Sequence, residues 1–300
     1  MIRTLLNGFC MALADSVPGV SGGTIALILG FYDNFIGVVH DLIYGKSEKK
    51  KTALKYLIKL GIGWGSGMLT AIYFLTAFFE KSIYSVSSLF FALVLCSIPV
   101  IVKEEYKRLK NKKHYLVFTF CGLALVVLLT YCNVSVSMFN GDLSSLGVRG
   151  AFYLFMCGAV AVCAMFLPGI SGSTVLLILG VYMPILKSVK ECIHLNFQHL
   201  SAVIIFASGV LIGAVASVKG IKLCLNKYRS QTVYAVIGML FGSLYAIVMG
   251  TTAHNPANQP LLPYHLSLPW FLAGIAIVAA IQLLKHLREQ KESELIRKQT

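Results

Sequence analysis

The sequence is poor in charged residues. Asp, Glu, Lys and Arg make up 13% of its 300 residues, against about 25% in an average soluble domain. Hydrophobic residues make up 57%, and the mean hydropathy is +0.77, which is more apolar surface than a soluble globule buries. These figures exclude disordered, fibrous and disulfide-scaffold chains. They predict a polytopic integral membrane protein.

No motif for metal binding or nucleotide hydrolysis is present. The eight cysteines form no C-x-x-C or C-x-x-H pair, and the seven histidines lack the spacing of metal ligands. No Walker motif occurs, and no His–Asp pair accompanies a glycine-flanked serine in the order that hydrolases use. We therefore expect no metal and no cofactor, and we assign no catalytic residue.

The net charge of +14 suggests nucleic-acid binding only until the positions of the charges are considered. The lysines and arginines lie almost entirely between or outside apolar runs, as in the loops that membrane proteins retain in the cytoplasm. Such loops also suit an anionic lipid surface. We therefore expect membrane lipids, and no nucleic acid, as partners. The basic segments are 46–59, 103–113, 219–230 and 285–300, with Arg3 before them.

The chain contains an internal repeat at an offset of 150 residues. Residues 18–32 (PGVSGGTIALILGFY) align with residues 168–182 (PGISGSTVLLILGVY), and ten of the fifteen positions are identical. The offset is half of the chain length, and a similar order of apolar runs surrounds each copy. This pattern indicates a duplication.

Each repeat is expected to be all-α, with a broken helical hairpin followed by three transmembrane helices. The run before each motif is shorter than the roughly 20 residues that cross a bilayer as a helix. Inverted repeats with broken helices are typical of secondary transporters. The predicted first repeat is 1–140 (hairpin 5–43, spans 54–79, 86–102 and 115–132), the second is 141–286 (hairpin 151–193, spans 200–224, 232–250 and 270–285), and 287–300 is a cytoplasmic tail.

The basic loops predict the topology. With both termini in the cytoplasm and each hairpin returning to the side it entered, all four basic segments lie inside. If the second motif were one kinked crossing, 219–230 and 285–300 would lie outside. Each half has an odd number of crossings beyond its hairpin, so the second repeat is inverted relative to the first. Charge does not distinguish a re-entrant hairpin from two complete crossings.

Each motif is expected to break one helix and begin another. Pro18 and Pro168 disfavour the α conformation in the preceding residue, and Ser21 is a natural N-cap. Irregular backbone survives in hydrocarbon only where it is buried or lines a wet cavity, so we expect the two breaks to meet. Helix starts suit a phosphate or carboxylate, whereas the alternative is close packing of small residues. The candidate phosphate-binding residues are Gly19, Ser21, Gly22, Gly23, Thr24, Gly169, Ser171, Gly172, Ser173 and Thr174.

Three charged residues near the motifs are candidates for coupling or gating. Asp15 lies three residues before Pro18, and an intramembrane carboxylate costs roughly 2.5–3.5 kcal/mol. It would carry a proton, repel substrate until neutralised, or accept hydrogen bonds from the broken backbone. Asp33 follows the first motif and is either a coupling group or an interfacial residue. Arg149 precedes the second hairpin and either attracts an anion or anchors its helix at the interface.

At these motifs the sequence resembles the PopT-type polyprenyl-phosphate transporters, a bacterial family first catalogued as a domain of unknown function. The resemblance rests on residues 14–24 (ADSVPGVSGGT), 30–33 (GFYD) and 164–173 (AMFLPGISGS), and it covers nearly the whole chain. It implies translocation of undecaprenyl phosphate across the bacterial cytoplasmic membrane, which recycles the lipid carrier for peptidoglycan synthesis. It also implies that the two loops hold the phosphate. Ala12 stands where we expect a glycine in the family, and Asp33 where we expect a glutamate.

Two other functions remain open at this stage. Undecaprenyl-pyrophosphate phosphatases also pair inverted repeats with a P-G-x-S-R-S-G motif. Here Gly172 occupies the arginine position, so a means of stabilising developing charge is missing. A secondary symporter of a small anion fits the residues as well as the lipid does. We expect a transporter of a lipid phosphate that breaks no bond.

Overall fold

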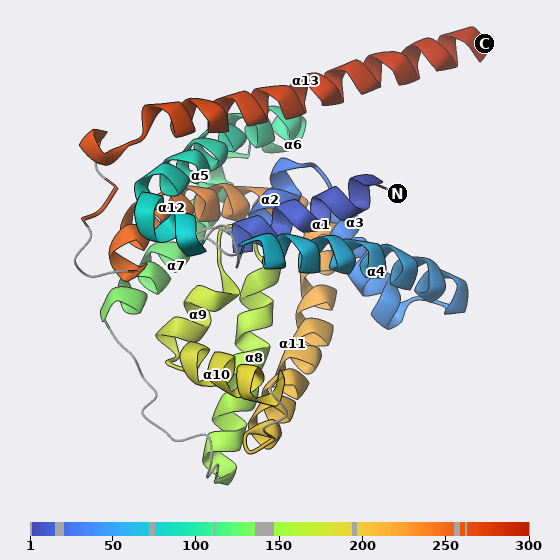
Figure 1. The fold of residues 1–300 in the computed structure, drawn as a ribbon. Coiled ribbons are helices and arrows are strands. Elements are labelled where there is room, and N and C mark those ends of the chain that lie inside the picture. The colour runs from blue at the N-terminus through green and yellow to red at the C-terminus, as the bar shows by residue number, and fades with distance from the viewer. Residues whose placement is uncertain are drawn as a thin grey trace.

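The computed structural model describes residues 2–15, 21–71, 76–110, 112–135, 147–193, 197–254, 259–261 and 263–299. All regular structure in these segments is helical, which confirms the predicted all-α class. The first half runs from blue to green in Figure 1. It contains α1 (Ile2–Asp15), α2 (Gly22–Ile28), α3 (Tyr32–Tyr44), α4 (Ser47–Thr70), α5 (Thr76–Glu104), α6 (Tyr106–Leu109) and α7 (Leu116–Ser135).

The second half presents a similar order of helices. A helix leads to a break, a seven-residue helix follows, and a tight turn then leads to another helix and to three longer ones. The main difference is the short helix α6 in the first half. The second half contains α8 (Val148–Phe166), α9 (Gly172–Ile178), α10 (Tyr182–Ile193), α11 (Leu200–Lys227), α12 (Arg229–His254) and α13 (Leu268–Gln299).

A glycine turn divides each apolar run that follows a motif. Gly30 (φ +72°) ends α2 and Gly180 (φ +71°) ends α9. In the first turn, the N–H of Gly30 donates to Leu27 O at 3.0 Å and that of Phe31 donates to Ala26 O at 2.9 Å, which is the Schellman pattern. Gly180 and the residue after it form the same pair of bonds. The runs 22–43 and 172–193 are therefore two helices each, because glycine reaches positive φ without a steric cost.

Several helices have the length and composition of membrane spans. Among the described residues, four are long and apolar enough to cross a bilayer, and two shorter apolar helices accompany them. Large apolar side chains such as Leu128 and Leu211 are 61% and 67% exposed, as expected where lipid replaces water around the protein. The protein is therefore a polytopic membrane protein. The four spans are Ile83–Glu104, Val148–Phe166, Leu200–Lys227 and Arg229–Met249, and the shorter helices are Leu116–Tyr131 and Leu268–Leu283.

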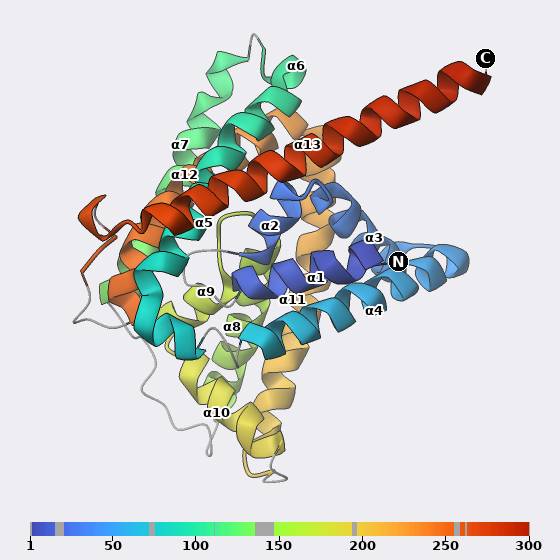
Figure 2. The same cartoon turned by 45° about the horizontal axis from the view of Figure 1, so that its top comes forward.

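Some predicted boundaries differ from the structure. The predicted span 54–79 is wrong at both ends, because α4 runs from Ser47 to Thr70 and α5 begins at Thr76. The backbone of α5 is therefore helical through 80–85, which does not form the expected loop before the span 86–102. No glycine or proline precedes Pro99 within α5 to stop the helix. The predicted tail 287–300 continues α13 as a helix to Gln299. Figures 1 and 2 show this end of α13 extending away from the other helices.

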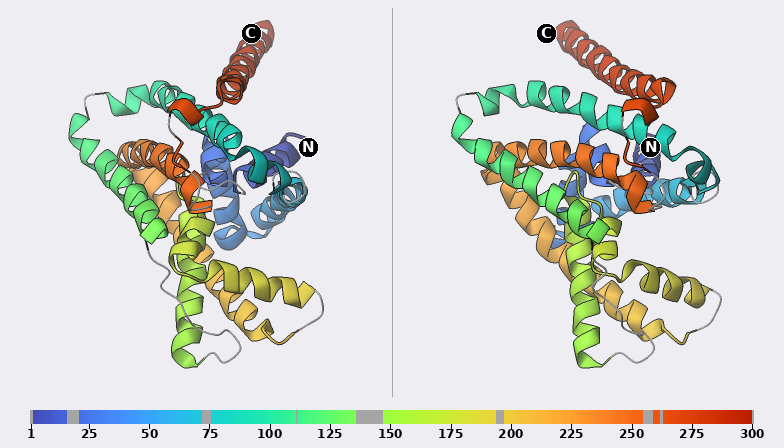
Figure 3. Two further views of the ribbon diagram at one scale, coloured as in Figure 1. Left: turned by 60° about the vertical axis from the view of Figure 1, so that its left-hand side comes forward. Right: turned by 90° about the vertical axis from the view of Figure 1, so that its left-hand side faces the viewer.

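Matched helix pairs pack through glycines. Helix α1 lies along α4, and α8 packs against α11 (Figures 2 and 3). A Cβ atom added to Gly8 would lie 2.0 Å from the carbonyl oxygen of Leu60, and one added to Gly158 would lie 2.5 Å from that of Phe206. Because Gly8 and Gly158 are 150 residues apart, the repeat includes this backbone approach. Helices of different halves also pack together, α7 with α12 and α5 with α13.

Candidate functional site

The start of α2, directly after the first helix break, lies against the second helix break inside the protein. The N–H of Gly169 donates a hydrogen bond of 2.8 Å to Oγ1 of Thr24. The hydroxyl of Ser21 donates to the carbonyl oxygen of Leu167 at 3.5 Å, and that of Tyr32 donates to Phe166 O at 2.7 Å. The described part of the first motif therefore holds the backbone of the second. These contacts support the predicted meeting of the two breaks, although residues 16–20 of the first break lie outside the described residues.

The two motifs begin their helices differently. Ser21 caps α2 as predicted, with φ −126° and ψ 150°, and its Oγ accepts from the N–H of Thr24 at 3.3 Å. Ser171 precedes α9 in an extended conformation but makes no such cap bond. Its hydroxyl instead pairs with that of Ser173 at 2.7 Å. The second motif thus has a pair of hydroxyls where the first has a capped helix start.

Asp15 binds the start of α2. Its Oδ1 accepts from the N–H of Gly22 at 2.6 Å, and its Oδ2 accepts from Nε1 of Trp64 at 3.0 Å. A Cβ atom at Gly22 would lie 2.8 Å from Oδ2, so a larger residue would displace the carboxylate. Of the roles considered for Asp15, the structure shows the one in which it accepts hydrogen bonds from the broken backbone. The chain's own carboxylate thereby occupies a helix start that suits an anion.

Helix α12 hydrogen-bonds to the backbone of the second break. The hydroxyl of Ser243 donates to Gly169 O at 3.1 Å and to Met239 O at 2.9 Å. Gly169 has φ +87°, and a Cβ atom there would lie 2.6 Å from Ser243 Oγ. Both its conformation and its surroundings therefore require glycine at this position.

Burial differs between the two motifs. Ser21 and Thr24 are fully buried, and Ser171 is 5% exposed, whereas Gly172, Ser173 and Thr174 are half-buried. A Cβ atom at Gly23 would lie 3.3 Å from Met165 O, so this glycine packs against the other half of the chain. In this conformation the first motif shows the close packing that was the alternative to a binding site. Pro168 is buried, whereas Pro18 and Gly19 lie outside the described residues.

Asp33 takes part in an ion-pair network. Its Oδ2 lies 2.6 Å from Nη1 of Arg229, and Nη2 of the same guanidinium lies 2.5 Å from Oε1 of Glu105. The network joins the first turn of α3 to the residue between α5 and α6 and to the start of α12. Asp33 directly follows Tyr32, whose hydroxyl contacts the second break. The network is therefore one residue away from a contact between the two halves.

Arg149 is not brought to the two breaks. It is exposed in the first turn of α8, and the break follows Phe166 at the other end. At 1.5 Å per residue these two positions are about 26 Å apart along the helix. Its placement is that of an end-of-helix residue.

The sequence matches the undecaprenyl phosphate translocase-like family over residues 11–260. This range covers both motifs, Asp15 and the Asp33–Arg229–Glu105 network. The chain belongs to the undecaprenyl phosphate translocase-like family. Two curated relatives carry the name polyprenyl-phosphate transporter. No solved structure matches this family member significantly.

Both relatives align with almost the entire translocase-like chain. The one from Staphylococcus aureus is 33% identical over 278 residues, which cover 91% of this chain and 93% of the relative. The one from Vibrio cholerae serotype O1 is 29% identical over an alignment 325 positions long, which covers 97% of each chain. The similarity therefore includes both halves and is not confined to one motif.

The sequence of this translocase-like protein did not predict three residues that hydrogen-bond to Asp15, Gly169 and Asp33. Trp64, Ser243 and Arg229 lie 49, 74 and 196 residues from Asp15, Gly169 and Asp33, their respective partners. Trp64 and Ser243 lie within helices, and Arg229 lies in a basic segment that was interpreted only as a topology signal. Each of these residues is a polar group within or beside an apolar stretch, which marks it as a possible hydrogen-bonding residue. The sequence does not show which residue it binds.

Proposed function

We propose that this protein transports undecaprenyl phosphate, or a related polyprenyl phosphate, across the bacterial cytoplasmic membrane without breaking a bond. Family membership and the names of the two relatives support the substrate class. The observation on which a shared site depends is the hydrogen bond between Gly169 and Thr24. It joins the two motifs at one place in the protein. Such transport would return the lipid carrier for peptidoglycan synthesis.

The proposed architecture is a pair of inverted repeats divided as predicted, 1–140 and 141–286. The shared order of helices supports it, as do the matched glycine contacts of α1 with α4 and of α8 with α11. In this arrangement both termini lie in the cytoplasm, and each broken hairpin returns to the side it entered. Repeats related in this way transport substrate when one rocks against the other around a fixed site.

The phosphate is proposed to bind between the two breaks when they separate. Its ligands would be the hydroxyls and backbone N–H groups of the two motifs. The N–H of Gly19, which lies outside the described residues, is among them. Because Asp15 accepts from Gly22 in the present conformation, a phosphate at this helix start replaces that carboxylate. Asp15 thereby acts as an internal competitor that closes the empty site. The isoprenoid tail remains in lipid throughout.

Bond cleavage is the second candidate function, because residues 19–23 (GVSGG) fit the letters of the nucleophile motif G-x-S-x-G. That motif requires a strand before the serine, whereas a helix, α1, precedes this one. The hydrogen bonds of Ser21 among the described residues are to Thr24 and Leu167, and neither is a general base. The transport function therefore fits the surroundings of Ser21 better.

The test uses purified protein in liposomes that contain fluorescent undecaprenyl phosphate in both leaflets. An impermeant quencher then reports how quickly lipid from the inner leaflet becomes accessible. We expect faster exchange than in protein-free liposomes and no release of inorganic phosphate from undecaprenyl pyrophosphate. Phosphate release would indicate the enzyme, and uptake of a small anion without lipid exchange would indicate the symporter.

A further inference from the structure

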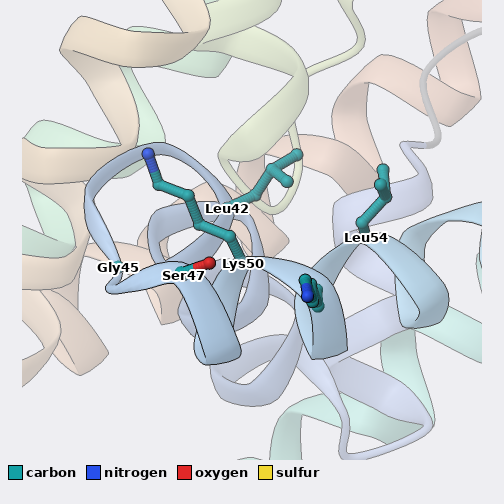
Figure 4. A pocket seen from close by; sticks show the side chains of 6 residues that line it. Leu42, Gly45, Ser47, Lys50 and Leu54 are labelled. Atoms are coloured by element: carbon teal, nitrogen blue, oxygen red, sulfur yellow. The ribbon is translucent and has the colours of Figure 1, made fainter.

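A surface pocket of about 340 Å³ lies at the turn between α3 and α4. Ser47, Lys50, Lys51 and Leu54 are exposed in it, whereas Leu42 and Gly45 are half-buried. Figure 4 shows the side chains of Leu42, Lys50 and Leu54 extending to the same side of α4. The pocket therefore combines ammonium groups, a hydroxyl and apolar surface.

The two lysines of this pocket have no acidic partner within the described part of the chain. Other basic side chains on neighbouring elements do have partners. Lys222 lies 3.3 Å from Asp41 and 2.9 Å from Nδ1 of His40, and Arg229 binds two carboxylates. Uncompensated positive charge is thus spread over the lysines at the start of α4, and Lys50 and Lys51 bring it to the pocket, where it would attract an anion.

The pocket lies where α4 changes from polar to apolar. The lysines of α4 all precede Leu60, and Leu54, Ile58 and Ile62 follow one another at four-residue spacing on one side of the helix. These three side chains are 48%, 52% and 61% exposed. An exposed apolar stripe of this kind suits hydrocarbon, and in that setting Lys50 and Lys51 at its polar end would lie at headgroup level.

We propose that this pocket binds the phosphate headgroup of an anionic membrane phospholipid such as phosphatidylglycerol. Lys50 and Lys51 bind the phosphodiester, Ser47 donates a hydrogen bond, and an acyl chain lies along Leu54, Ile58 and Ile62. Leu42, the pocket residue nearest in sequence to the helix breaks, lies ten residues beyond Tyr32 in α3, about 15 Å along the helix. The site is therefore separate from the proposed transport site and does not depend on it.

The test is native mass spectrometry of the full-length protein in detergent with added phosphatidylglycerol or phosphatidylcholine. We expect one phosphatidylglycerol to bind with at least tenfold preference. The Lys50→Gln, Lys51→Gln double variant should lose about tenfold in affinity, because two exposed ion pairs with the phosphate are removed. The matched control is Lys55→Gln with Lys59→Gln, which removes the same charge from the same helix outside the pocket and should change affinity less than twofold.

A second variant keeps both lysines. Leu54→Glu places a carboxylate beside the headgroup at an exposed position and should weaken phosphatidylglycerol binding at least as much. Equal losses in the two double-lysine variants, or equal binding of the two lipids, would overturn the proposal. Displacement of the lipid by millimolar inorganic phosphate would indicate a site for the free ion. Preferential binding of undecaprenyl phosphate in competition would assign the pocket to the substrate.

Discussion

The N–H of Gly169 and the hydroxyl of Thr24 are joined across 145 residues of sequence by a buried hydrogen bond of 2.8 Å. Gly169 belongs to the second helix break and Thr24 to the first turn after the first break. Gly169 adopts φ +87°, and its carbonyl oxygen accepts a hydrogen bond from the hydroxyl of Ser243. Its N–H therefore has a fixed direction. Thr24 therefore determines how closely the two breaks approach.

Replacing Thr24 should destabilise the contact between the breaks. Thr24→Val keeps the shape of the side chain but leaves the buried N–H of Gly169 without its acceptor, which should cost about 1–3 kcal/mol. The measurement is the free energy of unfolding in detergent. Thr174→Val is the control, because it removes the hydroxyl at the half-buried equivalent position. Equal effects of the two substitutions would contradict the special role of Thr24.

A matched pair of glycine substitutions tests the fit of Asp15 against α2. Gly22→Ala introduces a Cβ atom 2.8 Å from the Asp15 carboxylate and should lower the free energy of unfolding by about 1–3 kcal/mol. Gly37→Ala, on the neighbouring helix α3, has no atom within 4 Å of the new Cβ. It should raise the free energy of unfolding by up to about 1 kcal/mol. Stabilisation by both substitutions would show that Asp15 does not occupy this position.

The network around Arg229 should respond to loss of its members in a definite order. The side chain of Glu105 is 16% exposed and that of Asp33 is 51% exposed. Exposed ion pairs contribute about 0–1 kcal/mol, whereas removing one partner of a buried pair costs more. Thermal unfolding should therefore rank Arg229→Gln as the most destabilising, Glu105→Gln next and Asp33→Asn last. Lys112→Gln is the control, because it removes a nearby positive charge that is not part of the network. A larger effect of Asp33→Asn than of Glu105→Gln would contradict the assignment of Glu105 as the more strongly bound partner of Arg229.

Asp15 should influence how transport depends on pH. If its carboxylate competes with the substrate for the start of α2, protonation weakens that competition, and Asp15→Asn should flatten the pH profile of leaflet exchange. Trp64→Phe removes one hydrogen bond to Asp15 but keeps the carboxylate, so it should shift the profile without flattening it. Profiles of equal steepness in Asp15→Asn and the wild type would exclude Asp15 from the transport cycle.

The sequence predicts the broken helices well, because proline, glycine and a capping serine act over a few residues. The N-cap at Ser21 and the meeting of the breaks depend on such local signals and on the 150-residue repeat. The sequence predicts the ends of helices less well. The hydropathy does not change at Gly30, where α2 ends, and the partly polar residues 80–85 remain helical within α5. The partners of Asp15 and Asp33 depend on how distant helices pack, and that arrangement is not encoded in local spacing.

The central claim is tested most directly by leaflet exchange of fluorescent undecaprenyl phosphate in liposomes, comparing the wild type with the Ser21→Ala, Ser171→Ala double variant. Both hydroxyls belong to the proposed phosphate site, and their loss should slow exchange at least tenfold per folded molecule. Arg149→Gln, about 26 Å along α8 from the second break, is the control and should exchange lipid at the wild-type rate. Wild-type exchange no faster than in empty liposomes would contradict the account, as would full activity of the double variant.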